Sequence, residues 1–353
     1  MTADVLIAGG GPAGLAAAIR SAQRGHHTVL YERSDGVPDK ACGEGLMPAG
    51  ARELRAIGAE IDDCAEFHGI RYLQEDGSSA EARFRQGTGI GIRRTVLSAA
   101  LRQLAQEAGA ELRRGSVLEA RARDGHVDVV TTDGPQQARL LVAADGLHSP
   151  LRRAAGLEGG PAAAPPRYGI RRHFEIEPWT DLVEVYWSPG AEAYVTPVSR
   201  SSVNVAFLCS EGGRFEDLLA HFPALRERLG DAPCASEARG AGPLLQGVRR
   251  RYAHRLVLLG DAAGYVDAIT GQGLSLALAA SALLFSALPG DLAQDLTPGL
   301  HAYDGHVGKR WLRYAIPAHL LVALSRHPQL RRRAIRGAAA VPGAFATLLR
   351  LVA

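Results

Sequence analysis

The chain has 353 residues, of which 46% are apolar, and its formal net charge at pH 7 is only +3. This length suits about two domains or one large composite domain, and the small net charge excludes nucleic acid as an expected partner. The four cysteines form no C-x-x-C pair and have no zinc-type spacing with histidine, so we expect no metal site and a reduced, cytoplasmic setting.

The first forty residues predict a dinucleotide-binding unit. An apolar strand leads into the glycine turn at residues 9–14, and a helix and a second strand then lead to Glu32. Gly9 permits a tight turn, Gly11 lets the backbone approach a pyrophosphate, and Gly14 lets the helix pack against its strand. The free N–H groups at the helix start attract phosphate. Glu32 is placed to accept hydrogen bonds from a ribose.

A glycine-rich loop follows over residues 34–50 and contains Cys42 and Gly43. Two interpretations stay open for it: a surface loop with an inert thiol, or a loop beside the cofactor. The elements expected next are a helix over 51–60, two strands within 67–84, a helix over 94–108 and strands over 111–113, 117–121 and 127–131.

A second landmark is the apolar strand at 140–144, which ends in Asp145-Gly146. A carboxylate at the carboxyl end of a central strand lies where open α/β sheets bind ligands. A linker rich in Gly, Pro and Ala covers 157–166. Beyond it, alternating apolar runs predict an antiparallel sheet, with one face buried and the other exposed or lining a pocket. Its strands are expected at 168–176, 182–187, 193–198 and 203–208, before a helix over 215–230.

The third landmark is a buried strand at 256–259 that ends next to Asp261. The glycine loop at 269–274 and a long apolar helix follow. This arrangement can hold a ribityl or phosphate group with the carboxylate and the backbone, and the helix start can face negative charge on a ring. The alternative is a sharp strand-to-helix connection without a ligand.

The chain after residue 300 is predicted to be helical and increasingly basic. Its basic residues include Arg326, Arg331, Arg332, Arg333, Arg336 and Arg350. They are typical of solvated positions on helices that pack against the core, although a membrane-facing amphipathic segment stays open. The apolar run at 274–288 is too short to span a bilayer. The first strand begins at about residue 4, so we expect no signal peptide.

The three landmarks together resemble the flavoprotein superfamily of para-hydroxybenzoate hydroxylase and geranylgeranyl reductase. The resemblance covers about residues 3–290. It implies an α/β fold with a Rossmann-type FAD-binding domain, an antiparallel-sheet substrate domain and C-terminal helices. The expected FAD-binding parts are 1–65, 91–156 and 246–290. The expected substrate-sheet parts are 66–90 and 157–245, and the helical segment is 291–353.

The resemblance also implies which residues bind FAD. Carried over by position, they are Gly9, Gly11, Pro12, Ala13, Gly14, Glu32, Arg33, Cys42, Gly43, Arg94, Val117, Asp145, Gly146, Asp261, Gly271, Gln272, Gly273 and Leu274. Arg94 opens an R-x-x-L-x-x-x-L helix, and Val117 would meet the adenine through its backbone. The substrate pocket is expected at Tyr194, Pro197 and Trp187.

The resemblance leaves the reaction open between branches. The Cys42-Gly43 loop and the sequence around Asp261 are similar to reductases and halogenases. The reductases' aromatic tunnel signature keeps only Tyr194 and Pro197 here, and Ala268 replaces a usual proline. We therefore expect an FAD monooxygenase that uses NAD(P)H and O₂ on a small aromatic or polyketide-like compound of secondary metabolism. The alternatives are an FAD-dependent reductase of a C=C bond and a non-catalytic flavin-binding module.

Overall fold

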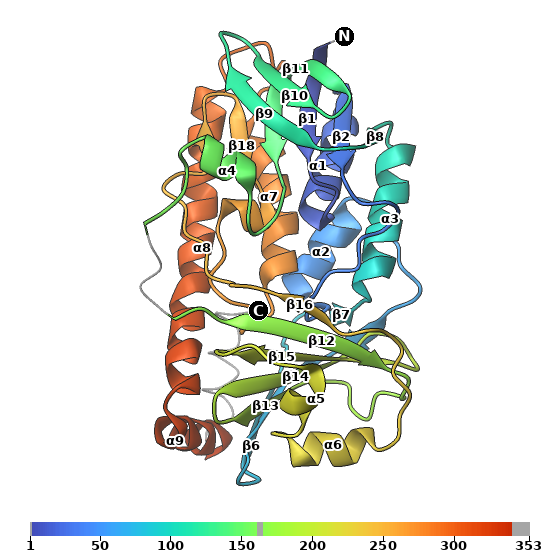
Figure 1. The fold of residues 1–353 in the computed structure, drawn as a ribbon, viewed down its shortest axis with the longest axis vertical. Coiled ribbons are helices and arrows are strands. Elements are labelled where there is room, and N and C mark those ends of the chain that lie inside the picture. Colours follow the sequence, from blue (N-terminus) through green and yellow to red (C-terminus); the bar gives the residue numbers. More distant parts are fainter. Residues whose placement is uncertain (1, 161–164, 341–353) are drawn as a thin grey trace.

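The computed structural model describes residues 2–160 and 165–340 of the chain (Figure 1). The body is elongated, with a parallel sheet and its helices at one end and a second sheet at the other. The long helix α8 (Thr297–Ser325) runs along both. The predicted fold class, a Rossmann-type unit beside a sheet-built domain with helices at the end of the chain, is confirmed.

The inner strands of the first sheet are apolar and covered on both faces, whereas its edge at residues 111–114 is polar and partly exposed. Its order is β17-β18-β11-β1-β2-β8, and the pairs β18–β11, β11–β1, β1–β2 and β2–β8 are parallel. The strands are β1 (Thr2–Ala8), β2 (Thr28–Glu32), β8 (Glu111–Arg114), β11 (Gly134–Ala143), β17 (Tyr252–Ala253) and β18 (Leu256–Leu258). Residues buried from both sides need continuous apolar sequence, which explains the absence of alternation in β1, β2, β18 and the second half of β11.

Helices cover one face of this sheet, and a second layer of strands covers the other. The helical side consists of α1 (Pro12–Ala22), α2 (Pro48–Ala56), α3 (Arg94–Glu107) and α7 (Gly273–Ala287), whose apolar residues share one core cluster. The opposite side consists of β9 (Val117–Ala122), β10 (Val127–Thr131) and α4 (Pro150–Ala154). β11 is longer than predicted because its first half also pairs antiparallel with β10.

The second sheet has the order β16-β12-β15-β14-β13-β5-β6 and is antiparallel except where β13 meets β5. Its strands are β5 (Gly69–Leu73), β6 (Ser79–Arg83), β12 (Tyr168–Phe174), β13 (Val183–Ser188), β14 (Ala191–Pro197), β15 (Val203–Cys209) and β16 (Arg239–Ala241). β5 and β6 thus reach this sheet from an early part of the chain. The short strands β3 (Gly45–Leu46), β4 (Ala65–Phe67) and β7 (Gly89–Gly91) form a separate sheet.

The structure corrects two details of the sequence prediction. The expected loop at 34–50 contains β3 and the first turn of α2, because Pro48 has the fixed φ that suits a helix start. The helix expected at 215–230 is broken into α5 (Phe215–Leu219) and α6 (Pro223–Leu229), since the residue before Pro223 is driven out of the helical region. Of the two alternatives for the second face of this sheet, the structure has the one that lines a pocket. α5 and α6 bury the outer face, and the inner face borders a cavity.

The C-terminal helices pack on the inner face of the second sheet, as the core interpretation expects. Arg331 on α9 (Pro328–Ala340) is buried over the Trp187 ring, with its guanidinium carbon 5.3 Å from the ring centre. Arg332 pairs with Glu75, and Arg336 pairs with Asp76 at 2.7 Å. Arg350 lies outside the described residues.

Candidate functional site

A large cavity lies between the carboxyl ends of the parallel strands and the inner face of the second sheet. Its volume is about 360 Å³. The ends of β1, β2, β11 and β18 form one wall, and β5, β13, β14 and β15 form the other. Residues 40–45 and the start of α7 close the space between them. Open α/β sheets bind ligands at this end of their strands.

Most of the residues predicted to contact the cofactor line this cavity. They are Gly9, Gly11, Pro12, Ala13, Glu32, Arg33, Cys42, Gly43, Arg94, Val117, Asp145, Gly146, Asp261, Gly271, Gly273 and Leu274. Of the three predicted substrate residues, Tyr194 also lines it. Four predicted residues lie elsewhere: Gly14, Gln272, Trp187 and Pro197.

The glycine turn is held by two close backbone approaches. Gly9 has φ +107°, and a Cβ there would lie 2.4 Å from the Ala144 carbonyl oxygen. A Cβ on Gly14 would lie 1.9 Å from the Gly9 carbonyl oxygen, so Gly14 packs behind the turn rather than on the cavity. Helix α1 begins at Gly11 without a side-chain cap. Its first N–H groups therefore remain available to an anion.

Glu32 orders the glycine turn as well as facing the cavity. Its Oε2 accepts a hydrogen bond from the Gly10 N–H at 2.7 Å, and its Oε1 accepts one from the Ser34 N–H at 2.9 Å. Burial alone would raise the pKa of Glu32, but these hydrogen bonds outweigh burial, and the pKa is lowered. Each oxygen keeps a lone pair for a ribose hydroxyl.

The loop that carries Cys42 is anchored by a buried acid that the sequence did not identify. Glu44, at φ +59°, accepts the Arg94 N–H at 2.7 Å and pairs with His173 Nε2 at 2.6 Å. The Glu44 and His173 side chains are almost completely buried. The Asn204 amide donates to the Cys42 carbonyl at 2.9 Å. The loop is thereby tied both to α3 and to the second sheet.

The Cys42 thiol faces the cavity in its protonated form. Burial, with a further contribution from Glu44, raises its pKa to about 11, even though Arg94 acts in the opposite direction. A thiol with a raised pKa is a poor nucleophile. We propose that Cys42 lies beside the bound cofactor and that its thiol is unreactive at neutral pH.

We expect iodoacetamide to alkylate Cys42 far more slowly than the exposed Cys234 at about pH 8, because only the thiolate reacts. Peptide mass spectrometry after timed quenching measures both rates in one sample. The Cys42 rate should still be rising at about pH 10, since its pKa lies near 11. Equal rates for the two cysteines at about pH 8 would show that Cys42 is a thiolate there.

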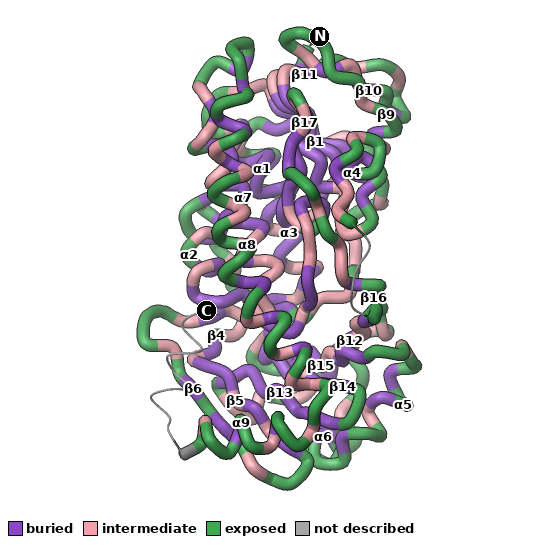
Figure 2. Tube along the Cα trace, turned by 90° about the vertical axis from the view of Figure 1, so that its left-hand side faces the viewer, coloured by how far each residue is buried: buried purple, intermediate pink, exposed green. Residues whose placement is uncertain are grey.

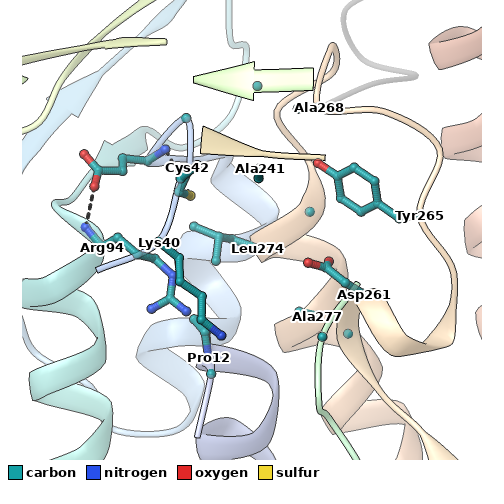
Figure 3. Close-up of a pocket in the computed structure, with 18 of the residues that line it drawn as sticks. Pro12, Lys40, Cys42, Arg94, Ala241, Asp261, Tyr265, Ala268, Leu274 and Ala277 are labelled. Atoms are coloured by element: carbon teal, nitrogen blue, oxygen red, sulfur yellow. Dashed lines mark hydrogen bonds between the residues drawn. The ribbon is translucent and has the colours of Figure 1, made fainter. Parts of the chain in front are cut away.

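Two carboxylates in the cavity wall lack full partners within the described chain. Asp145 accepts the Leu151 N–H through Oδ2 at 3.2 Å, whereas its buried Oδ1 has no described partner. Asp261 points into the cavity from the turn after β18, and its carboxylate makes no hydrogen bond to any described residue (Figure 3). The surrounding protein raises the pKa of Asp261 by desolvation, although Arg94 and Lys40 partly offset this effect.

These features fit FAD. The uncapped start of α1 suits the pyrophosphate, and Glu32 and Asp261 can accept hydrogen bonds from ribose and ribityl hydroxyls. Lys40 and Arg94 lie on the same side of the cavity as Pro12, where they can neutralise phosphate (Figure 3). No group of three or more His, Cys, Asp or Glu side chains suited to a metal ion occurs among the described residues.

The wall opposite this region is apolar with a few hydroxyl groups. Its side chains include Ile70, Tyr72, Val183, Val185, Tyr194, Thr196, Leu208 and Leu244. The Tyr194 hydroxyl donates to the Ile269 carbonyl oxygen at 3.2 Å. Tyr265, which the sequence did not identify, points its hydroxyl into the cavity, and this hydroxyl makes no hydrogen bond to a described residue (Figure 3). A Cβ on Gly273 would lie 4.0 Å from that oxygen, so Tyr265 adjoins the start of α7.

The predicted residues that miss the cavity have clear local reasons. Trp187 is near the far end of β13, where Tyr72 and Arg331 enclose its ring. Pro197 ends β14 and sits against β7, since a Cβ on Gly91 would lie 1.7 Å from the Pro197 carbonyl oxygen. Gln272 is the N-cap residue of α7 and its side chain makes no capping hydrogen bond.

Comparison with known proteins identifies the family. Residues 2–184 match the family model described as an FAD binding domain. The chain is 33% identical over 308 residues to digeranylgeranylglycerophospholipid reductase 1 of Methanopyrus kandleri, covering 79% of this chain and 78% of the relative. It is 28% identical over 308 residues to menaquinone reductase of Mycolicibacterium smegmatis, covering 78% and 74%.

Solved structures support the fold. The flavin-dependent brominase Bmp2 superposes with a TM-score of 0.84 at 17% identity, covering 100% of this chain and 93% of that one. Because the family model spans more than half of the chain and a relative exceeds 30% identity, the sequence resemblance is confirmed. The chain therefore belongs to the FAD-binding-domain family, as a flavin-dependent oxidoreductase of the para-hydroxybenzoate hydroxylase and geranylgeranyl reductase superfamily.

Proposed function

We propose that this protein is an NAD(P)H-dependent reductase that adds hydrogen across a C=C bond of an apolar substrate. The observation that carries the proposal is the Tyr265 hydroxyl, which points into an apolar-walled cavity and makes no hydrogen bond to a described residue (Figure 3). Burial raises the pKa of Tyr72 to about 12 and raises those of Tyr194 and Tyr265 well above the usual value. These hydroxyls, like the Cys42 thiol, therefore carry their protons at neutral pH.

Reduction of a C=C bond needs a hydride at one carbon and a proton at the other. FAD, when bound and reduced, supplies the hydride, and NAD(P)H is the proposed source of its electrons. The chain supplies the remaining parts. The apolar wall holds the substrate away from water, and the Tyr265 hydroxyl, which no described residue engages, delivers the proton.

The relatives favour the same reaction. Both relatives described above are named as reductases, one of a phospholipid and one of menaquinone. We therefore propose an isoprenoid-bearing or similarly apolar substrate. The wall departs from a purely aromatic tunnel at Thr196, which faces the cavity. Glu192, on the same strand, is buried outside the wall and pairs with Arg167. A shorter chain than in the relatives is expected to fit.

Hydroxylation of a small aromatic compound is the second candidate. The observation that favours it is the pair of hydroxyl groups from Tyr194 and Thr196 on the sheet wall, which suit a compact polar ring better than a long hydrocarbon. However, hydroxylation of a phenol gains from a base near the ring, and these hydroxyls are poor bases. A non-catalytic flavin-binding module would have no use for the raised pKa values around an apolar cavity.

Replacing Tyr265 by Phe should lower kcat by about a hundredfold, the usual contribution of one positioned proton donor. FAD content and melting temperature should stay unchanged, because the hydroxyl makes no bond within the described protein. The assay follows anaerobic consumption of NAD(P)H with menaquinone in detergent as the probe.

Tyr194→Phe is the matched control, since the wild-type Tyr194 hydroxyl already donates its hydrogen bond to a backbone carbonyl oxygen. Its kcat should change only a few-fold. If Tyr265→Phe keeps full kcat and the wild-type pH profile, Tyr265 is not the proton donor.

A further inference from the structure

Helix α8 presents on its outer side an apolar stripe that stays exposed in the described part of the chain. Leu312, Ile316 and Leu320 are 55%, 62% and 58% exposed, and their spacing of four residues places them on one helix face. Figure 2, in which α8 faces the viewer, shows exposed residues along this side of the helix. We name these three residues the α8 stripe. Contiguous exposed apolar side chains of this size mark interaction surfaces.

The surroundings of the α8 stripe are strongly basic. The 49 residues after Asp304 contain nine Lys and Arg residues and no Asp or Glu, whereas the rest of the chain has more acidic than basic residues. Lys309, Arg313 and Arg326 are exposed on α8 and at its end. The arginines of α9 contribute less to this basic surface, because Arg332 and Arg336 already pair with acidic residues of the β5–β6 turn.

We propose that the α8 stripe docks this protein onto the surface of an anionic phospholipid membrane. Leucine and isoleucine side chains on one face, flanked by basic residues, are the composition of helices that lie in the membrane interface. Anionic head groups attract the basic flank. The contact is peripheral, since no helix among the described residues is long and apolar enough to cross a membrane.

Charge argues against a second copy of the chain as the partner. A two-fold contact through the α8 stripe would place the same surface of both copies face to face. Lys309 and Arg313 of one copy would then meet their own equivalents, with no acidic residue on this part of α8 to compensate. An anionic surface removes this repulsion.

The position of the α8 stripe relative to the cavity connects membrane docking with the candidate functional site. On its inner side α8 contributes Arg310, Trp311 and Tyr314 to a small void of about 40 Å³. That void shares Asp261, Tyr265 and Gly273 with the main cavity. A single helix therefore separates the proposed membrane surface from the site. The docking itself does not depend on which reaction the site performs.

Vesicle flotation tests this surface. The full chain with bound FAD is mixed with vesicles of phosphatidylcholine containing about 30 mol% phosphatidylglycerol, and with pure phosphatidylcholine vesicles. The wild type should float with the anionic vesicles and bind neutral vesicles about tenfold more weakly, with binding that falls as salt is raised. The triple variant Leu312→Gln, Ile316→Gln, Leu320→Gln should bind anionic vesicles about a hundredfold more weakly.

The matched control is the double variant Leu118→Gln, Val130→Gln, which removes exposed apolar residues from β9 and β10. It should float as the wild type does. FAD content and elution volume should be equal for all three proteins. The proposal is overturned if the wild-type protein does not bind anionic vesicles. It is also overturned if the triple variant binds them as well as the wild type does. A wild-type dimer that the triple variant converts to monomer would assign the α8 stripe to self-association instead.

Discussion

Replacement of Asp261 by Ala is expected to give a folded protein that purifies without FAD. The Asp261 carboxylate points into the cavity and has no hydrogen-bond donor among the described residues, so the cofactor is its natural partner (Figure 3). Hydrogen bonds to a charged group contribute about 1.5–3 kcal/mol each, so losing two of them should weaken FAD binding by about two orders of magnitude or more.

The same substitution should not harm the fold without FAD. Desolvation raises the pKa of Asp261, so the ionised carboxylate is less stable in the folded protein than in the unfolded chain. Above the ordinary pKa of Asp this difference lowers the stability of the protein, and removing the group relieves it. The protein without FAD should therefore melt at the same temperature or higher at neutral pH.

The measurement is the flavin absorbance after desalting, followed by titration with FAD. Asp261→Asn, which keeps the size and one acceptor oxygen, should fall between the Ala variant and the wild type. Asp291→Ala, at an exposed carboxylate far from the cavity, should retain full FAD. Full occupancy in Asp261→Ala would mean that the carboxylate has no part in holding the cofactor.

Replacement of Gly14 by Ala should have the largest effect on stability. The added methyl group would lie 1.9 Å from the Gly9 carbonyl oxygen and 3.3 Å from the Ala144 Cβ, so α1 must move away from the sheet. Ala144 belongs to the packed core, and Gly9 lies against the Ala144 carbonyl group, so neither neighbour has room to shift. We expect a loss of about 3 kcal/mol or more in the free energy of unfolding, and loss of FAD, because the glycine turn moves with the helix.

Gly305→Ala in α8 is the matched control for this prediction. It is also a glycine within a helix, and a Cβ there would meet no atom within 4 Å. Ala is favoured over Gly in helices by about 1 kcal/mol, so this variant should be slightly more stable than wild type. Urea denaturation followed by circular dichroism measures both. Equal stability of the two variants would show that the close packing behind the turn is not required.

Local sequence patterns predicted the parts of the site that one segment builds alone. The glycine turn, Glu32, Asp145 and Asp261 each follow a strand directly, and the strand delivers them to the same edge of the sheet. The break between α5 and α6 follows from the sequence in the same way, because the ring of Pro223 disfavours a helical conformation in the residue before it.

Contacts between distant segments could not be predicted from local sequence patterns. His173 meets Glu44 across 129 residues, and neither position carries a motif of its own. Trp187 shares its sheet face with Val185, which lines the cavity, yet it lies beyond the cavity under Arg331. Alternation in a strand predicts on which face of the sheet a side chain lies, but not how far along the strand a cavity extends. Tyr265 lies in a loop whose path only the packed structure fixes.

The most direct test of the proposed reaction is the mass of the product formed under an ¹⁸O₂ atmosphere. The FAD-loaded protein is incubated with NAD(P)H and menaquinone, and separately with a geranylgeranyl-bearing lipid, and the extracts are analysed by mass spectrometry. A C=C reductase should add two hydrogen atoms to the substrate and no labelled oxygen, because the hydride comes from the reduced flavin and the proton from the Tyr265 hydroxyl. A product that carries ¹⁸O, or probes that stay unchanged while NAD(P)H is consumed, would contradict the assignment of this protein as a C=C reductase.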